Sequence, residues 1–271
     1  MKVEIYSSSL TKESIDAVNP RLLNKIKSLE LELTNVTAIC KLKANKLFDD
    51  DFAINFTYVS NKIERNSITR QEVQEYYRHQ NKPYHRSIIE IQEMKNHFSA
   101  WEFVRSQTDN PIENFSLSTI LNIHYMVTYQ ILQNHQAGLM RNTEVRVSNS
   151  PLITPKHEEL ESIMRHYFAW FHKARTTMHP VVLAAAAHIK LGAIHPFVDG
   201  NGRTARLFTN LILLHYNLPP IILDEEEIKK YFLVLRAHSL YKHYSAFIDF
   251  TLSNAIQSWS YYLYLAQEHC N

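Results

Sequence analysis

The chain has 271 residues, of which 45% are hydrophobic and 21% are charged, so it can bury a sizeable core in one large domain or two smaller ones. Its 29 basic and 27 acidic residues leave a formal net charge of +2, which indicates neither a nucleic acid nor a membrane as partner. Only 4 glycines and 9 prolines interrupt the sequence, and this scarcity favours long helices with short loops. We therefore expect an all-α fold.

The predicted helices follow one another along the whole chain. The residues at 69 and 72 have the T-x-x-E spacing of a capping box, which marks the start of one of them. Helical patterns cover approximately residues 20–33, 36–60, 69–77, 86–105, 116–132, 158–173, 181–194, 202–216, 225–240 and 244–268.

The sequence also carries expectations about location and metals. Its start lacks the apolar stretch of a secretory signal, and the most apolar helix, 181–194, is too short to span a bilayer and contains His188 and Lys190. We therefore expect a cytoplasmic protein that contacts no membrane. No C-x-x-C or H-E-x-x-H pattern occurs, so a protein-only metal cage is not expected.

One segment, residues 143–155, departs from the helical pattern. It alternates apolar and polar residues, is rich in β-branched side chains and contains two prolines, which predicts a short hairpin or an extended edge. Such an edge can dock a partner peptide by strand addition, although an ordinary surface loop fits the residues equally well.

The stretch HPFVDGNGRTAR, residues 195–206, holds two of the four glycines. Pro196 disfavours helical dihedrals at His195, so the preceding helix should end there and leave the imidazole at a helix–loop junction. Gly200 and Gly202 permit positive φ and close main-chain approach just before a new helix, whose free N–H groups can bind an anion. A simple glycine turn would also explain these residues.

Two arginines strengthen the case for an anion. Arg203 and Arg206 lie in the first turn of the predicted helix, where cations oppose the helix dipole by about 0.3–1 kcal/mol each. A polyphosphate matches guanidinium geometry, and Asp199 suits Mg²⁺, which prefers one or two carboxylates together with substrate phosphates. Since His195 can accept a proton near neutral pH, the group fits phosphoryl or nucleotidyl transfer.

This twelve-residue stretch resembles the motif HPFx[DE]GNGRxxR of the Fic family at every defining position. The resemblance implies an all-α Fic-like bundle with a short β-hairpin flap, which transfers AMP from ATP to a Ser, Thr or Tyr hydroxyl of a target protein. It implies that His195 is the general base and Asp199 the Mg²⁺ ligand. It also implies phosphate contacts from the main chain of Gly200, Asn201 and Gly202, with Arg203 at the β-phosphate and Arg206 at the γ-phosphate.

The resemblance implies three further sites. The flap that aligns the target would be residues 144–153, with docking residues Glu144, Val145, Arg146, Val147, Leu152 and Ile153. Ser60 and Glu64 match the inhibitory pattern [ST]xxxE[GN], whose glutamate pairs with the second motif arginine, although Arg65 stands where the family has Gly or Asn. Tyr231 and Phe232 correspond to an aromatic pair in the family and are candidates for packing against adenine, or else ordinary core residues.

The resemblance also bears on organisation and partners. We expect an N-terminal helical region, residues 1–110, that contains the inhibitory helix near 40–64, and a Fic core at 111–271, together forming one compact unit. Homodimers are common in the family. Removal of AMP, transfer of UMP or phosphate, and a non-catalytic nucleotide-regulated peptide-binding role remain open alternatives at this point.

Overall fold

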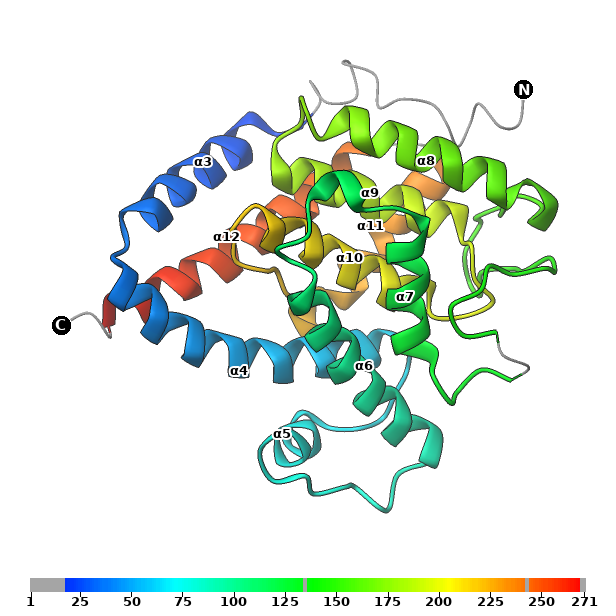
Figure 1. Ribbon diagram of the computed structural model, residues 1–271, viewed down its shortest axis with the longest axis horizontal. Coiled ribbons are helices and arrows are strands. Elements are labelled where there is room, and N and C mark those ends of the chain that lie inside the picture. The colour runs from blue at the N-terminus through cyan, green and yellow to red at the C-terminus, as the bar shows by residue number, and fades with distance from the viewer. Residues whose placement is uncertain (1–17, 134–135, 242–243, 269–271) are drawn as a thin grey trace.

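The helices seen in the computed structural model, which describes residues 18–133, 136–241 and 244–268, form one bundle around two central helices (Figure 1). The described residues contain no strand, which confirms the all-α prediction. The α-helices are α3 (Pro20–Asn35), α4 (Ala38–Ile63), α5 (Arg70–His79), α6 (Ile88–Ser106), α7 (Leu117–Thr128), α8 (Leu160–Ala174), α9 (Pro180–Ile194), α10 (Asn201–His215), α11 (Ile228–Tyr241) and α12 (Ser245–Glu268). Short 3₁₀ turns lie at Ile112–Asn114, His157–Glu159 and Glu225–Glu227.

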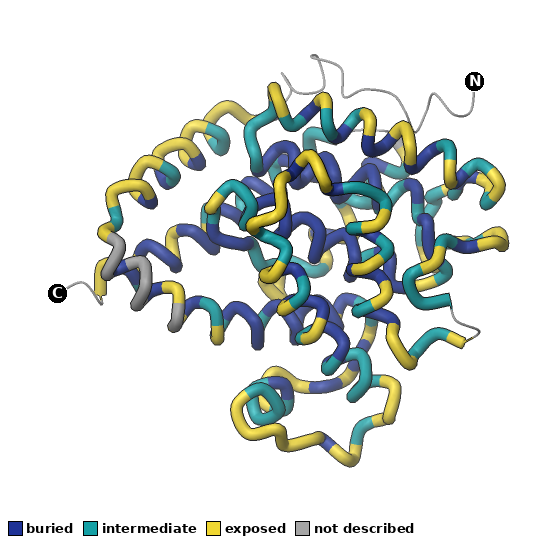
Figure 2. Tube along the Cα trace, viewed as in Figure 1, coloured by how far each residue is buried: buried dark blue, intermediate teal, exposed yellow. Residues whose placement is uncertain are grey.

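The two central helices are α9 and α10, which pack against each other and flank the HPFVDGNGRTAR loop. Helix α9 is apolar apart from His188 and Lys190 and is buried almost throughout, as expected for a helix enclosed by others. Helix α10 also packs on α4, α6 and α7, and it is buried from Asn201 to Leu213 apart from Gly202 (Figure 2).

The first and last described helices meet across the molecule. Helix α12 packs on α3, α4, α9 and α11, and one hydrophobic core includes residues from α3 through α12. Helix α5 lies at the edge of the bundle, where it packs on α4 and is partly buried (Figures 1 and 2). Its predicted capping box is present, because the Thr69 side chain and the Glu72 carboxylate each accept a bond from the other's main-chain N–H. None of the described helices is both long and apolar enough to cross a membrane.

The segment predicted as a β-hairpin reverses direction without forming strands. Ser150 N–H donates to the Val147 carbonyl at 3.2 Å, and Asn149 has a φ of 56°. The Thr154 hydroxyl donates to the Val145 carbonyl at 2.8 Å, so a side chain joins the two arms. The hairpin prediction is therefore right in the chain reversal but wrong in the strand pairing.

Candidate active site

His195 lies directly after α9, at the position that Pro196 predicts. It is the C-cap of α9 with a left-handed φ of 53°, and its N–H donates to the Leu191 carbonyl at 3.0 Å. Its Nδ1 lies 3.3 Å from the Gly192 carbonyl, and because a carbonyl only accepts, the proton sits on Nδ1. Nε2 is therefore the acceptor nitrogen. Burial lowers the pKa of His195 below 6.5, which favours the neutral imidazole that can act as a base.

The main chain at the start of α10 is arranged to receive an anion. Gly200 is the N-cap with a φ of 76°, and no side chain caps the helix. Asn201 folds back on the loop: its Oδ1 accepts from the Phe197 N–H at 3.0 Å and its Nδ2 donates to the Phe197 carbonyl at 2.9 Å. Because the first N–H groups of a helix have no partner within it, this end carries partial positive charge.

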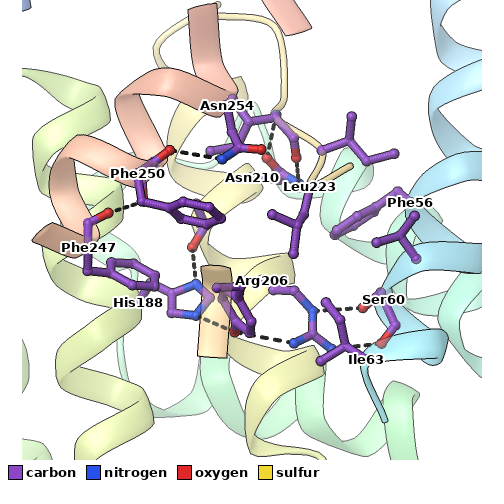
Figure 3. A pocket seen from close by; sticks show the side chains of 16 residues that line it. Phe56, Ser60, Ile63, His188, Arg206, Asn210, Leu223, Phe247, Phe250 and Asn254 are labelled. Carbon is purple, nitrogen blue, oxygen red and sulfur yellow. Dashed lines mark hydrogen bonds between the residues drawn. The ribbon is translucent and has the colours of Figure 1, made fainter. Parts of the chain in front are cut away.

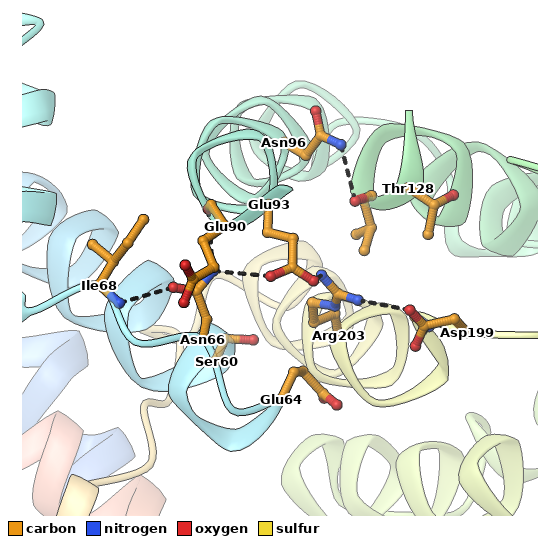
Figure 4. A network of polar contacts seen from close by, with 12 residues as sticks. Ser60, Glu64, Asn66, Ile68, Glu90, Glu93, Asn96, Thr128, Asp199 and Arg203 are labelled. Carbon is orange, nitrogen blue, oxygen red and sulfur yellow. Dashed lines mark hydrogen bonds and ion pairs between the residues drawn. The ribbon is translucent and has the colours of Figure 1, made fainter. Parts of the chain in front are cut away.

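Arg203 is held from two sides by carboxylates (Figure 4). Its side chain is only 2% exposed, with Nη1 2.8 Å from Glu93 Oε1 and Nη2 3.4 Å from Asp199 Oδ2. The other oxygen of Glu93 accepts from Asn66 Nδ2 at 2.9 Å. The charge of Arg203 is thus balanced within the protein, and the guanidinium fixes the Asp199 carboxylate, which is 55% exposed.

Arg206 faces α4, where Ser60 and Glu64 surround its guanidinium. Nε donates to the Ser60 hydroxyl and Nη2 to the Ser60 carbonyl, both at 2.9 Å (Figure 3). Nη2 also lies 2.8 Å from Glu64 Oε1. The side chain of Arg206 is buried and that of Glu64 is partly buried, so this ion pair is shielded more than a surface pair. The predicted contact of Glu64 with Arg206 is present.

The turn that carries Glu64 keeps its shape even though Arg65 replaces Gly or Asn. Glu64 is the C-cap of α4, and Arg65 adopts a φ of 70°. Arg65 N–H donates to the Lys62 carbonyl at 2.9 Å and Asn66 N–H to the Asn61 carbonyl at 3.1 Å, which is a Schellman motif. Glycine is favoured at such a left-handed position, but arginine adopts it here and leaves the geometry intact.

Gly202 makes room for the ion pair between Arg206 and Glu64. A Cβ at this position would lie 2.7 Å from Glu64 Oε1 and 3.0 Å from Arg206 Nη1. Its conformation is helical, so the glycine is required for space and not for a positive φ. Gly192, in contrast, has nothing within 4 Å of its missing Cβ.

These residues border one cavity of about 170 Å³ between α4, α9, α10, α11 and the segment 144–153. Outside the segment 144–153, seven of the predicted site residues line it, namely Glu64, His195, Asn201, Gly202, Arg206, Tyr231 and Phe232. Asp199, Gly200 and Arg203 are not part of this lining. The base and the second arginine thus meet in one cavity, while the first arginine lies beneath the loop.

The two aromatic residues on α11 differ in their surroundings. Tyr231 is buried, and its hydroxyl lies 3.1 Å from His188 Nε2 and 3.4 Å from Arg206 Nη1. His188 is a packed structural residue, since its Nδ1 also lies 3.1 Å from the Thr209 hydroxyl. Phe232 is 49% exposed at the rim of the cavity. Of the pair, Phe232 is the residue with a free face for a planar ligand.

The segment 144–153 borders the cavity through part of its length. Val147 and Leu152 line it together with Ser150, whereas Glu144 points away. The Glu144 carboxylate accepts from the His157 N–H at 3.1 Å and lies 2.9 Å from His157 Nδ1. Among the predicted docking residues, Val145, Arg146 and Ile153 are absent from the cavity lining.

Three residues that support the site escaped the sequence analysis as functional candidates. Glu93 sits within an ordinary helical pattern, and nothing in its spacing points to Arg203. His124 stacks on Phe197 at 3.7 Å between ring centroids, accepts from the Gly138 N–H at 3.0 Å and donates to the Asp199 carbonyl at 3.0 Å. Arg141 lies outside the motif and carries no sequence signal for a role in the site, yet its guanidinium donates to the His195 carbonyl at 2.9 Å.

Fold and site together define the class of protein. Residues 114–213 match the model of the Fic/DOC family, so this part of the chain is a Fic/DOC domain. The chain is 31% identical over 245 residues to Protein adenylyltransferase Fic of Nematostella vectensis, a match that covers 84% of this chain and 56% of that protein. It therefore spans little more than half the length of this relative.

Solved structures share the fold. The structure of Fic-1 (residues 134–508) from C. elegans superposes with a TM-score of 0.82 at 24% identity, covering 92% of this chain and 73% of that one. The structure of IbpAFic2 in complex with adenylylated Cdc42 gives a TM-score of 0.56 at 17% identity, covering 94% of this chain and 76% of that one. At these identities the likeness establishes the fold alone.

Proposed function

We propose that the protein transfers AMP from ATP to a hydroxyl of a target protein and that Glu64 restrains this activity. The observation that carries the proposal is the single cavity in which the imidazole of His195, the α10 N-terminus and Arg206 meet, with Glu64 on Arg206. The relative from Nematostella vectensis is a protein adenylyltransferase by name, which supports the same reaction.

In the proposed reaction, His195 Nε2 takes the proton of the target hydroxyl as its oxygen attacks the α-phosphorus of ATP. The bond from that phosphorus to the bridging oxygen breaks, and pyrophosphate leaves. The N–H groups at the start of α10 would bind the phosphates, and Arg206 would bind the terminal phosphate once Glu64 releases it. The segment 144–153 would hold the target beside the cavity.

Asp199 fits a magnesium ion that arrives with the nucleotide. Its carboxylate is the hard oxygen ligand that Mg²⁺ prefers, and it is exposed enough to accept one. Within the described part of the chain, the group of three potential ligand residues is Glu144, His157 and Glu158, which does not include Asp199. A single carboxylate needs phosphate oxygens and water to complete an octahedron, and the ion would neutralise phosphate charge.

The restraint has a clear physical basis. Arg206 cannot offer Nη2 fully to a phosphate while that nitrogen is bonded to both Ser60 and Glu64. We expect Glu64→Gly to raise AMP transfer about tenfold or more, because a charge-assisted bond that competes with the nucleotide is removed. Glu64→Gln is the matched variant: it keeps the shape, loses the charge and should fall between wild type and Glu64→Gly.

The test is incorporation of label from α-³²P-ATP into proteins of a cell lysate. The double variant Glu64→Gly with His195→Ala should bind ATP, as measured by calorimetry, yet transfer no label. Equal incorporation by wild type and Glu64→Gly would show that Glu64 does not restrain the transfer. Label transfer by the double variant would show that His195 is not the base, and mass spectrometry of the labelled protein would identify the group transferred.

A further inference from the structure

A buried arginine outside the motif joins the segment 144–153 to the loop that carries His195. The Arg141 side chain donates Nε to the His195 carbonyl at 2.9 Å, Nη1 to the Thr143 carbonyl at 2.9 Å and Nη2 to the Pro155 carbonyl at 2.6 Å. Its main-chain N–H donates to the Pro196 carbonyl at 2.8 Å. One residue therefore contacts three separate places in the chain.

Two of those places are the ends of the segment 144–153. Thr143 precedes the segment and Pro155 closely follows it, so the two Nη atoms of Arg141 draw its ends together. Glu144 Oε1 and His157 Nδ1, which lie 2.9 Å apart, join the same two ends of the segment. With both ends fixed, the arms that carry Val147 and Leu152 are held against the cavity.

The third place is the loop that sets the direction of the imidazole. His195 has a left-handed φ of 53°, a conformation that non-glycine residues keep only when their surroundings hold them in it. Arg141 donates to the carbonyls of His195 and Pro196, which belong to the two successive peptide groups that follow the imidazole-bearing residue. It thereby fixes the backbone from which the imidazole extends.

We infer that Arg141 is a positioning residue for the transfer reaction, one that holds the imidazole of His195 and the target-binding segment as a single rigid unit. The inference rests on the function proposed above. A hydroxyl bound by the segment must meet Nε2 within hydrogen-bonding distance, and an arginine that bonds both partners fixes that distance. Without it, the base and the target move independently.

Only arginine suits this position. Its planar fork presents Nε, Nη1 and Nη2 in three fixed directions, one to each carbonyl, whereas lysine offers a single nitrogen on a flexible stem. The positive charge also acts on His195. Arg141 lowers the pKa of that imidazole, in the same direction as burial, while the Gly192 carbonyl and the carboxylates of Asp199 and Glu64 raise it.

The experiment compares Arg141→Lys and Arg141→Met with Arg175→Lys, all in the Glu64→Gly background. Arg175 is a partly buried arginine that pairs with Glu113 at 2.7 Å and lies outside the site, so it controls for loss of an arginine contact. We expect Arg141→Lys to lower kcat for AMP transfer about tenfold or more while KM for ATP changes less than about twofold, since misplacement costs turnover and not phosphate binding.

The pH profile of kcat/KM separates geometry from charge. Arg141→Met removes a charge that lowers the pKa of His195, so the acidic limb of its profile should move to higher pH, whereas Arg141→Lys should keep the limb near that of the parent. Full kcat in Arg141→Lys would overturn the inference. So would an equal loss in Arg175→Lys.

A measurement on the wild-type protein tests the inference even if the variants fail to fold. If Arg141 joins the two parts, its amide and that of His195 should have the same hydrogen-exchange protection factor, because one opening event exposes both. A protection factor about tenfold lower for the Arg141 amide would show separate openings and refute the inference. If Glu64→Gly transfers no AMP, the proposed function fails, whereas the exchange rates still decide whether the two parts move together.

Discussion

At the scale of single residues, Gly202 shows how closely the site is packed. Two helical glycines line the cavity, yet a Cβ would meet charged atoms at Gly202 and nothing at Gly192. The close contact at Gly202 comes from Glu64, a residue 138 positions earlier in the sequence. The glycine of the motif thus makes room for the contact between Glu64 and Arg206.

The pair of glycines gives a direct test of this crowding. Gly192→Ala should raise the free energy of unfolding by about 0.5–1 kcal/mol, because alanine favours a helix interior. Gly202→Ala should show no gain, or a loss of about 1 kcal/mol, because its methyl group displaces Glu64 or Arg206. Urea unfolding of both variants, repeated with Glu64→Gly, completes a double-mutant cycle. An equal gain for both glycines in the wild-type background would contradict the crowding.

Some single residues of the site could be predicted from the sequence, and others could not. The motif itself predicted His195, Asp199 and Arg206, because its spacing is specific. Glu93 could not be predicted, since its partner Arg203 lies 110 residues away and charged residues on a helix are usually solvated. The mismatch at Arg65 looked damaging in the sequence, yet it falls on a left-handed position that arginine tolerates.

At the scale of elements, a line of hydrogen bonds joins α9, α10 and α11. The Thr209 hydroxyl donates to the Ala205 carbonyl, so its oxygen accepts from His188 Nδ1. His188 Nε2 then accepts from the Tyr231 hydroxyl, whose oxygen accepts from Arg206 Nη1. Every proton in this line has one consistent position, with His188 neutral, and its pKa is lowered to about 3 mainly by burial.

Tyr231→Phe should lower the free energy of unfolding by about 1–3 kcal/mol, because His188 Nε2 is then buried without a donor. Tyr264→Phe is the control: this tyrosine on α12 is 55% exposed, and its change should stay within about 0.5 kcal/mol. Both values come from denaturant unfolding at pH 7. If the two variants were equally stable, the hydroxyl of Tyr231 would have no structural role.

Helices were predictable from the sequence, and the flap was not. Apolar periodicity and capping residues are local signals, so each predicted helix is present with ends shifted by only a few residues. The alternation of apolar and polar residues at 143–155 predicted strands, but a strand needs a ladder of main-chain hydrogen bonds to a neighbouring strand. In the structure, the side chains of Arg141, Glu144 and Thr154 take the place of such a ladder.

At the scale of the whole molecule, three buried histidines make stability depend on pH. Burial lowers the pKa of His188 to about 3 and of His124 to about 4, and that of His97 well below 6.5. The unfolded chain binds these protons below pH 6.5 and the folded protein does not. The histidines therefore favour the folded state fully above pH 6.5, and this contribution is lost as the pH falls.

We expect the free energy of unfolding to fall between pH 6.5 and 4.5, with a slope approaching about 1.4 kcal/mol per pH unit for each buried histidine. Urea unfolding at half-unit intervals measures the slope. His124→Gln keeps a donor for the Asp199 carbonyl and an acceptor for the Gly138 N–H but cannot titrate, so its slope should be smaller by one proton. A stability that stayed constant from pH 7 to 5 would contradict this account.

If Glu64 restrains AMP transfer as we propose, its position as the C-cap of α4 has a consequence for how the restraint is released. The ends of helices unravel far more readily than their middles, so this carboxylate can leave Arg206 when one turn uncoils while the rest of the bundle stays folded. A partner that binds residues 61–66 would therefore set how often Arg206 is free to bind a phosphate. A restraint located at the end of a helix can thus be adjusted in small steps.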